Sequence, residues 1–194
     1  MDPTHDQARR RLGLLLAGGG RRIRTLAAQA GGAGRRELAA AGLPGAVLET
    51  AERLADREVP AMLEHLAATG WRWVTPDDGE YPRDLASIAD PPLGLFVRGG
   101  LPTAPTAAMV GSRRATAYGL QVARLLAGEI AREGVVVVSG MARGVDRAAH
   151  EGAIDAGGCT WAVWGAGPDR VYPAEHQRLA ERITGAGALI TEYP

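Results

Sequence analysis

The sequence predicts an α/β fold in which a small all-helical domain precedes a doubly wound parallel sheet. Residues 6–68 are rich in Ala, Leu and Arg, with apolar residues three and four positions apart, which is the period of amphipathic helices. After residue 106, short apolar runs alternate with helical patterns, as expected for parallel strands joined by crossover helices. The chain has 194 residues, of which 46% are hydrophobic, and this is enough for one ordinary domain and a small companion.

The first part of the chain, residues 1–75, is expected to be a small helical domain, similar to a SAM domain, with three or four short helices. Val47, Leu48, Ala51 and Leu54 illustrate the helical spacing. Glycine-rich breakers divide this region, and no strand pattern precedes them, so we expect turns between helices rather than nucleotide-binding loops. The breakers are Gly18-Gly19-Gly20, Gly31-Gly32-Ala33-Gly34 and Gly42-Leu43-Pro44-Gly45.

Residues 76–105 are expected to form a connector between the two domains. Turn residues dominate it, with a short strand expected before it at 71–74 and another inside it at 93–97. Trp71, Trp73 and Tyr81 lie at this junction. Amphipathic aromatic residues at a domain junction are usually packing residues, which is the favoured interpretation, and stacking on nucleic-acid bases is the alternative.

Residues 106–194 are expected to form a Rossmann-like domain. Strands are predicted at 106–110, 135–138, 160–164 and 188–191, and helices at 118–132, 145–156 and 173–183. Right-handed crossovers between these strands favour a doubly wound sheet of parallel strands. The chain stops at Glu192-Tyr193-Pro194, directly after a strand, so we expect this domain to be incomplete at its C-terminal end.

Composition excludes several classes of protein. The 22 basic residues are all Arg and are balanced by 22 acidic residues, so the chain has no overall field that attracts a polyanion and no lysine for a Schiff base or a P-loop. A single cysteine, Cys159, cannot form a disulfide within the chain. The first residues lack the pattern of a signal peptide, and no apolar run is long enough to cross a bilayer. We therefore expect a soluble cytoplasmic protein that does not bind membranes.

Two loops carry the residues of an anion site. The first predicted strand leads into Gly111, Ser112 and Arg113, where the N-terminus of a helix and a guanidinium group both favour a phosphate. The second strand leads into Ser139 and Gly140. Because adjacent parallel strands place such loops side by side, we expect one phosphate cradle at the carboxyl edge of the sheet. The alternative is that these glycines only permit tight turns, since the G-x-G-x-x-G motif is absent.

Two further kinds of site are disfavoured. Ser139, Asp146 and His150 contain the groups of a hydrolytic triad, and Asp146 and His150 would share one helix face. No nucleophile elbow surrounds the serine, however, and a carboxylate in a first helical turn usually interacts with backbone N–H groups. The four histidines, His5, His65, His150 and His176, are widely separated, so no metal site is expected.

The motifs of this second region resemble those of the DNA-processing protein A family, also called Smf. The resemblance rests on VGSRRATAYG, on VVVVSGMARGVDRAAHEGAIDAGGCTWAVWGAGPDRVYPAEHQRLAERI and on GALITEYP, and it covers residues 78–194. It implies a single-stranded DNA-binding protein of natural transformation, which protects incoming strands and helps to load the recombinase RecA. It also implies a homodimer in the full-length family, and neither a cofactor nor enzymatic turnover.

The resemblance also assigns site residues. The DNA-contacting motif of the family falls on Gly111, Ser112 and Arg113. Its second loop falls on Ser139, Gly140, Met141 and Ala142, with Gly144 and Asp146 shaping that loop. Met141, Val145 and Thr191 replace the Leu, Ile and Ser that are usual in the family. A later basic motif, the remaining strands and a winged-helix-like domain of the family would lie beyond Pro194.

Two other functions are weighed against this one. The first is a nucleotide-binding or nucleotide-cleaving enzyme on a related Rossmann-like scaffold, such as the cytokinin-activating phosphoribohydrolases. Their P-G-G-x-G-T-x-x-E motif is absent from this sequence. The second is a shortened, non-catalytic interaction module that keeps the fold without the DNA channel.

Overall fold

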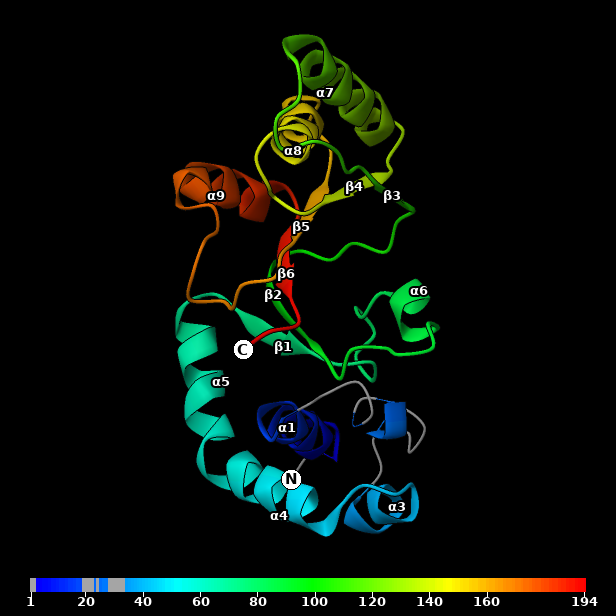
Figure 1. The fold of residues 1–194 in the computed structure, drawn as a ribbon, viewed down its shortest axis with the longest axis vertical. Coiled ribbons are helices and arrows are strands. Elements are labelled where there is room, and N and C mark those ends of the chain that lie inside the picture. The colour runs from blue at the N-terminus through cyan, green and yellow to red at the C-terminus, as the bar shows by residue number, and fades with distance from the viewer. Residues whose placement is uncertain (1–2, 19–22, 24, 28–33) are drawn as a thin grey trace. The chain divides into compact units, whose positions relative to one another are not determined.

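The computed structural model describes residues 3–18, 23, 25–27 and 34–194 (Figure 1). The chain divides into two compact units, Met1–Leu95 and Phe96–Pro194. The division passes through the segment that the sequence analysis treats as a connector. The predicted domain bounds at 75 and 105 remain predictions.

The first unit is mainly helical, as the sequence predicted. The turns expected at 18–20 and 31–34 lie outside the described residues, except for Gly18 and Gly34. The described elements of this unit are α1 (Pro3–Leu16), α3 (Arg35–Ala40), α4 (Gly45–Arg57), α5 (Val59–Ala68), β1 (Arg72–Val74) and α6 (Arg83–Ala86).

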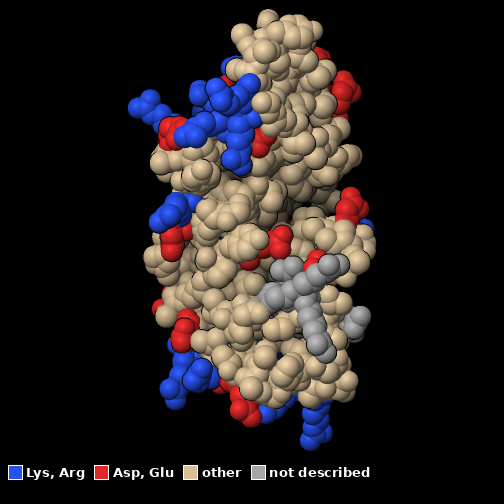
Figure 2. Space-filling view, in the orientation of Figure 1, with Lys and Arg blue, Asp and Glu red and all other residues tan. Residues whose placement is uncertain are grey.

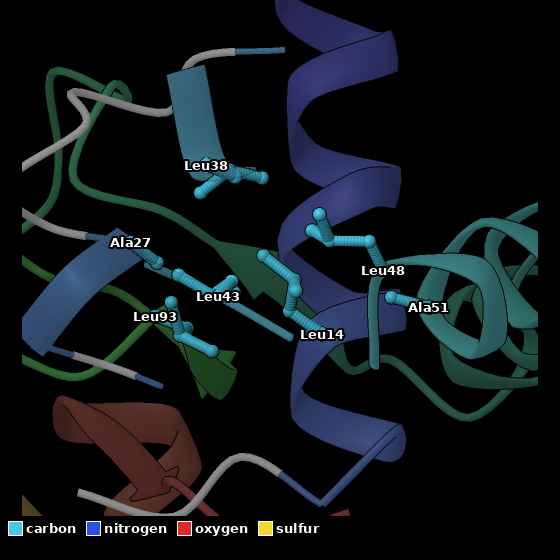
Figure 3. Close-up of a cluster of buried hydrophobic side chains, with 7 residues drawn as sticks. All are labelled: Leu14, Ala27, Leu38, Leu43, Leu48, Ala51 and Leu93. Atoms are coloured by element: carbon cyan, nitrogen blue, oxygen red, sulfur yellow. The ribbon is translucent and has the colours of Figure 1, made fainter. Parts of the chain in front are cut away.

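The core of the first unit forms where α1, α3 and α4 meet. Figure 3 shows its buried side chains, which are Leu14, Ala27, Leu38, Leu43, Leu48, Ala51 and Leu93. Gly13 allows α1 and α4 to approach closely, because a Cβ atom at this position would lie 2.4 Å from the carbonyl oxygen of Ala51. The predicted turn at 42–45 is present: Gly42 has a φ of +94°, and the N–H of Leu43 donates to the carbonyl of Leu38 at 3.0 Å.

The aromatic residues of the junction are packing residues, as the favoured interpretation predicted. Trp71 and Tyr81 are each 4% exposed, and the Tyr81 hydroxyl donates to the carbonyl of Pro92 at 3.2 Å. The indole N–H of Trp73 donates to the carbonyl of Ala8 at 3.2 Å. These contacts confine the three rings within the first unit, which leaves them unsuited to stacking on a ligand.

The second unit confirms the predicted α/β fold. Its sheet has the strand order β2-β6-β5-β4-β3, and β3, β4, β5 and β6 are parallel. The order runs in one direction from β3 to β6, as in one half of a doubly wound sheet. The elements are β2 (Leu95–Gly99), β3 (Thr106–Ala108), α7 (Ala117–Arg132), β4 (Val136–Ser139), α8 (Val145–Asp155), β5 (Thr160–Val163), a 3-10 turn (Ala174–His176), α9 (Gln177–Ala186) and β6 (Ala188–Thr191).

The strand expected at 93–97 within the connector adds to this sheet as β2, which pairs antiparallel with β6. Val97 lies opposite Ile190 in this pair. The apolar run at 93–97 indicated a strand, but a run of this kind carries no information on strand direction. The sheet is therefore mixed, with a wholly parallel part from β6 to β3.

Small residues join the crossover helices to the sheet. Val137 of β4 packs in a cluster with Ala127 and Ala131 of α7 and with Ala149 and Ala153 of α8. A Cβ atom on Gly152 would lie 2.2 Å from the carbonyl oxygen of Arg124, so α7 and α8 approach more closely than any larger residue at this position allows. This tight helix pair fixes the ends of β3 and β4, from which the candidate site is built.

Ion pairs also connect α7, α8 and α9, and Figure 2 shows basic and acidic side chains beside one another on the face that it draws. Arg124 of α7 pairs with Glu151 at 3.2 Å and also with Asp155, and Arg182 of α9 pairs with Asp155 at 2.6 Å. These arginines are therefore neutralised by α8. The cations of the candidate site lie on other segments, in the loops after β3, β4 and β5.

Candidate functional site

The loop between β3 and α7 presents the first predicted group of site residues. Gly111, Ser112 and Arg113 are all exposed. The hydroxyl of Ser112 accepts a hydrogen bond from the backbone N–H of Arg114 at 3.1 Å. Thr116 caps α7 by accepting from the N–H of Gly119 at 3.1 Å. The loop is thus shaped by its own hydroxyl groups, and its arginine side chains extend from the surface.

The loop between β4 and α8 is organised by buried polar groups. Asp146 is 7% exposed, and one of its carboxylate oxygens accepts from the N–H groups of Gly140 at 3.2 Å and Ala142 at 3.3 Å. Ser139 is 4% exposed, and its hydroxyl donates to the carbonyl of Met109 at 2.7 Å. Met141 is fully buried with a φ of +57°. Three of the predicted site residues, Ser139, Met141 and Asp146, therefore shape the loop from within.

The two loops are in direct contact, which confirms the prediction that they lie side by side. The N–H of Val145 donates to the carbonyl of Ser112 at 3.2 Å. Gly144 has a φ of +80°, and a Cβ atom on it would lie 2.2 Å from that same carbonyl oxygen. A Cβ atom on Gly111 would lie 2.7 Å from Val145. The glycines at 111 and 144 are therefore required for the contact itself.

A third loop, between β5 and α9, joins this surface, although no site residue was predicted in it. Arg143 of the second loop pairs with Glu175 at 2.5 Å. His176 is 3% exposed, and its Nδ1–H donates to the carbonyl of Met141 at 2.9 Å. The only available signal was general: this loop also follows the carboxyl end of a parallel strand, where ligand sites form in such sheets.

Arginine is the only charged residue of the first loop, whereas the third loop contains Arg170 together with the exposed Asp169 and Glu175. Arg113 and Arg114 in the first loop and Arg170 in the third are exposed, and none has a carboxylate within ion-pair distance among the residues that the structure describes. Arg143 is the exception because Glu175 neutralises it. The first loop therefore offers two guanidinium groups to an external anion, and the third loop offers one.

His150 lies beneath the loops as a neutral residue. The hydroxyl of Thr160 donates to the carbonyl of Val137 at 2.7 Å, so it accepts from the Nδ1–H of His150, also at 2.7 Å. Burial, and secondly the nearby His176, lower the pKa of His150 to about 3. The Nε2 atom is buried and has no hydrogen-bond partner in the described part of the chain.

The hydrolytic triad weighed in the sequence analysis is not assembled. The side chain of Ser139 bonds to Met109, that of Asp146 to two backbone N–H groups, and that of His150 to Thr160. All three groups serve to hold the loops and the strands together.

Within the described ranges, we find no group of three or more His, Cys, Asp or Glu side chains that could hold a metal ion. In the same residues no helix is both long enough and apolar enough to span a membrane.

Comparison with known proteins gives one family. The family model described as DNA recombination-mediator protein A matches residues 72–194. A protein from Mycobacterium tuberculosis, "Putative DNA processing protein DprA", is 45% identical over an alignment of 147 positions that covers 68% of this chain and 38% of that protein. "DNA processing protein DprA" from Bacillus subtilis is 36% identical over 140 residues, which are 71% of this chain and 47% of that protein. The chain thus spans less than half the length of these relatives.

Two solved structures are also similar. The X-ray structure of DNA processing protein A from Streptococcus pneumoniae has a TM-score of 0.78 and 28% identity, and the match covers 94% of this chain and 66% of that one. A structure from Helicobacter pylori has a TM-score of 0.54 and 31% identity, and the match covers 63% of this chain and 55% of that one. Its title describes the single-stranded DNA binding mode of that DNA processing protein A.

Proposed function

This chain belongs to the DNA recombination-mediator protein A family, and we propose that it binds single-stranded DNA through the phosphates of the strand. The proposal rests on the observation that two glycine-containing loops after adjacent parallel strands form one surface with exposed guanidinium groups. Gly111, Ser112 and Arg113 would contact the strand directly, with the exposed parts of Gly140, Ala142 and Gly144 beside them.

The chemistry of the loops suits a strand bound without reading its bases. Exposed guanidinium groups recognise phosphate, which is present in every nucleotide. Ser139, Met141 and Asp146 are buried, so their proposed role is to hold the second loop against the first. On this assignment the binding energy comes mainly from phosphate contacts and is sensitive to salt.

The wider role follows from the family. We propose that the protein takes part in the processing of incoming DNA during natural transformation, protecting the strand and helping to load RecA, and that the full-length protein is a homodimer. The family description as a recombination mediator supports this role. Because the chain spans less than half of its curated relatives, these activities are proposed for the whole protein, and DNA binding is the part that this chain can test.

The test is a titration of a fluorescently labelled oligothymidylate, followed by anisotropy, with the wild-type chain, Arg113→Ala and Arg132→Ala. Arg132 is the matched control because it is an exposed arginine at the opposite end of α7, about 20 Å from the first turn of that helix. We expect Arg113→Ala to bind more weakly and Arg132→Ala to bind as wild type does.

Two results would contradict the proposal. If wild type does not bind the oligonucleotide, the interaction-module alternative is favoured over DNA binding by this chain. If wild type binds and Arg113→Ala leaves the affinity unchanged, the DNA site lies elsewhere. Product analysis after incubation with nucleotides tests the remaining alternative, since turnover would indicate an enzyme.

A further inference from the structure

The second unit contains three tyrosines, and all of them are exposed. Tyr118 is 77% exposed, Tyr172 is 59% exposed and Tyr193 is 57% exposed. Tyr81 of the first unit is the contrasting case, since its ring is buried and its hydroxyl is bonded. Tyrosine is a large aromatic residue that gains most of its stabilising energy from burial. Three exposed rings in one unit therefore need an explanation other than the packing of this unit.

The topology brings these rings to one edge of the sheet. Tyr118 follows β3, Tyr172 follows β5 and Tyr193 follows β6, and these strands are parallel. Each ring therefore lies after the carboxyl end of its strand, at the edge that also carries the candidate site. The strand β4, between β3 and β5, ends in the second loop, which contains no aromatic residue.

The first loop, which leads to Tyr118 in the first turn of α7, and the third loop, which contains Tyr172, both contact the second loop. On one side, the N–H of Val145 donates to the carbonyl of Ser112 in the first loop. On the other side, Arg143 and Met141 contact Glu175 and His176, just after Tyr172. The strands β3 and β5 are two strand spacings apart, about 10 Å. The first and third loops thus both contact the second loop, and the exposed Tyr118 and Tyr172 belong to the segments on either side of it.

Tyr118 and Tyr172 each have close in sequence an arginine that forms no ion pair within the described part of the chain. Arg113 and Arg114 precede Tyr118 at the start of α7, and Arg170 precedes Tyr172. Surfaces that bind single strands combine cations for the phosphates with aromatic rings for the bases.

We infer that Tyr118 and Tyr172 stack on the bases of a single strand whose phosphates lie on the first and second loops. The inference rests on the proposed function, and it adds base contacts to the phosphate contacts. Stacking accepts every base because each has an aromatic face, so these contacts would tighten binding without selecting a sequence. They would also favour single strands over duplexes, in which the bases are already stacked.

The test uses two labelled oligonucleotides of equal length, oligothymidylate and an abasic oligomer with the same phosphates. Tyr118→Ala and Tyr172→Ala are compared with Tyr118→Phe and Tyr172→Phe, which keep the ring. Each alanine variant is expected to bind oligothymidylate about tenfold more weakly than wild type and to bind the abasic oligomer equally well. The phenylalanine variants are expected to bind as wild type does. Leu125→Ala, two turns further along α7 and also exposed, is the control for a change on this helix.

The outcomes separate this inference from the proposed function. If the alanine variants lose the same affinity for both oligomers, or lose none, the rings do not stack on bases and the inference is wrong. If wild type binds neither oligomer, the proposed function fails and takes this inference with it. If the phenylalanine variants lose as much as the alanine variants, the hydroxyl groups make the contact and the stacking role is overturned.

Discussion

Protonation of His150 should destabilise the second unit as the pH falls. The ring is fully buried, and its pKa is lowered to about 3 by burial and, secondly, by His176. In the unfolded chain the pKa returns to about 6.5. Since the folded pKa is the lower one, the unfolded state binds more protons between these values. The stability that depends on neutral His150 is therefore complete above pH 6.5 and is lost progressively as the pH falls from 6.5 towards 3.

The size of this effect follows from the two pKa values. A shift of one pKa unit corresponds to about 1.4 kcal/mol. Between pH 7 and pH 5 the unfolded histidine becomes almost fully protonated, whereas the folded one stays neutral. The free energy of unfolding should then fall by about 2 kcal/mol over this interval because of His150 alone.

The assay is urea unfolding, followed by circular dichroism, at pH 7 and at pH 5 for wild type and for His150→Gln. Glutamine is neutral at both pH values and keeps a donor for the hydroxyl of Thr160. Because the variant is less stable at both pH values, the quantity compared is the change in the free energy of unfolding between pH 7 and pH 5 in each protein. Wild type should lose about 2 kcal/mol more than the variant. Parallel losses would refute the conclusion that His150 is held neutral by burial.

Three further predictions concern the loops, the helix pair and a surface ion pair. Gly144→Ala should lower the free energy of unfolding by about 1–3 kcal/mol, because alanine is strained at a φ of +80°. It should also weaken oligonucleotide binding, because its Cβ atom would displace the Ser112 carbonyl. Unchanged binding in a titration would argue against a surface shared by the two loops. Gly152→Ala should lower the free energy of unfolding in urea by about 1–3 kcal/mol, since its Cβ atom would lie 2.2 Å from the Arg124 carbonyl oxygen. Gly185→Ala is the control, because its Cβ atom would have no neighbour within 4 Å, and it should cause no loss of stability. Equal effects of the two substitutions would contradict the tight helix contact. Arg72 lowers the pKa of Glu80 through a hydrogen bond, so this ion pair stabilises the fold fully above about pH 4.3, and its contribution is lost as the pH falls through the lowered pKa. Because both side chains are more than a third exposed, Glu80→Gln should lower the free energy of unfolding at pH 7 by less than about 1 kcal/mol. A larger loss would mean that the pair is better shielded from water than the structure shows.

Local pattern was sufficient to predict the strands and helices of the second unit. The run Val135-Val136-Val137-Val138 indicated a strand buried on both faces, and Val136 and Val137 are almost completely buried. The alternation of strands and helices then fixed the parallel arrangement from β3 to β6, and this arrangement placed the loops at 111–113 and 139–144 next to one another. These features depend on short-range periodicity and on general rules of chain connection.

The remaining features depend on contacts between distant residues. Arg143 and Glu175 are 32 residues apart, so nothing local in the sequence indicated that the third loop joins the site. The left-handed conformation of Met141 is unusual for a residue with a side chain, and it is stabilised in part by the hydrogen bond from His176 to its carbonyl. The sequence also did not indicate which loop residues are buried. Ser139 was assigned from its place after a strand, and Asp146 from the family resemblance as a residue that shapes the loop, and tertiary packing places both beneath the surface.

The salt dependence of oligothymidylate binding tests the central claim most directly. For a single strand, each phosphate contact contributes about −0.7 to the slope of log K against log salt concentration. We predict that Arg113→Ala binds more weakly than wild type at every salt concentration and has a slope smaller in magnitude by about 0.7, while Arg132→Ala keeps the wild-type slope. If the slope of Arg113→Ala equals that of wild type, Arg113 does not contact a phosphate, and the account of the loops as the DNA site is contradicted.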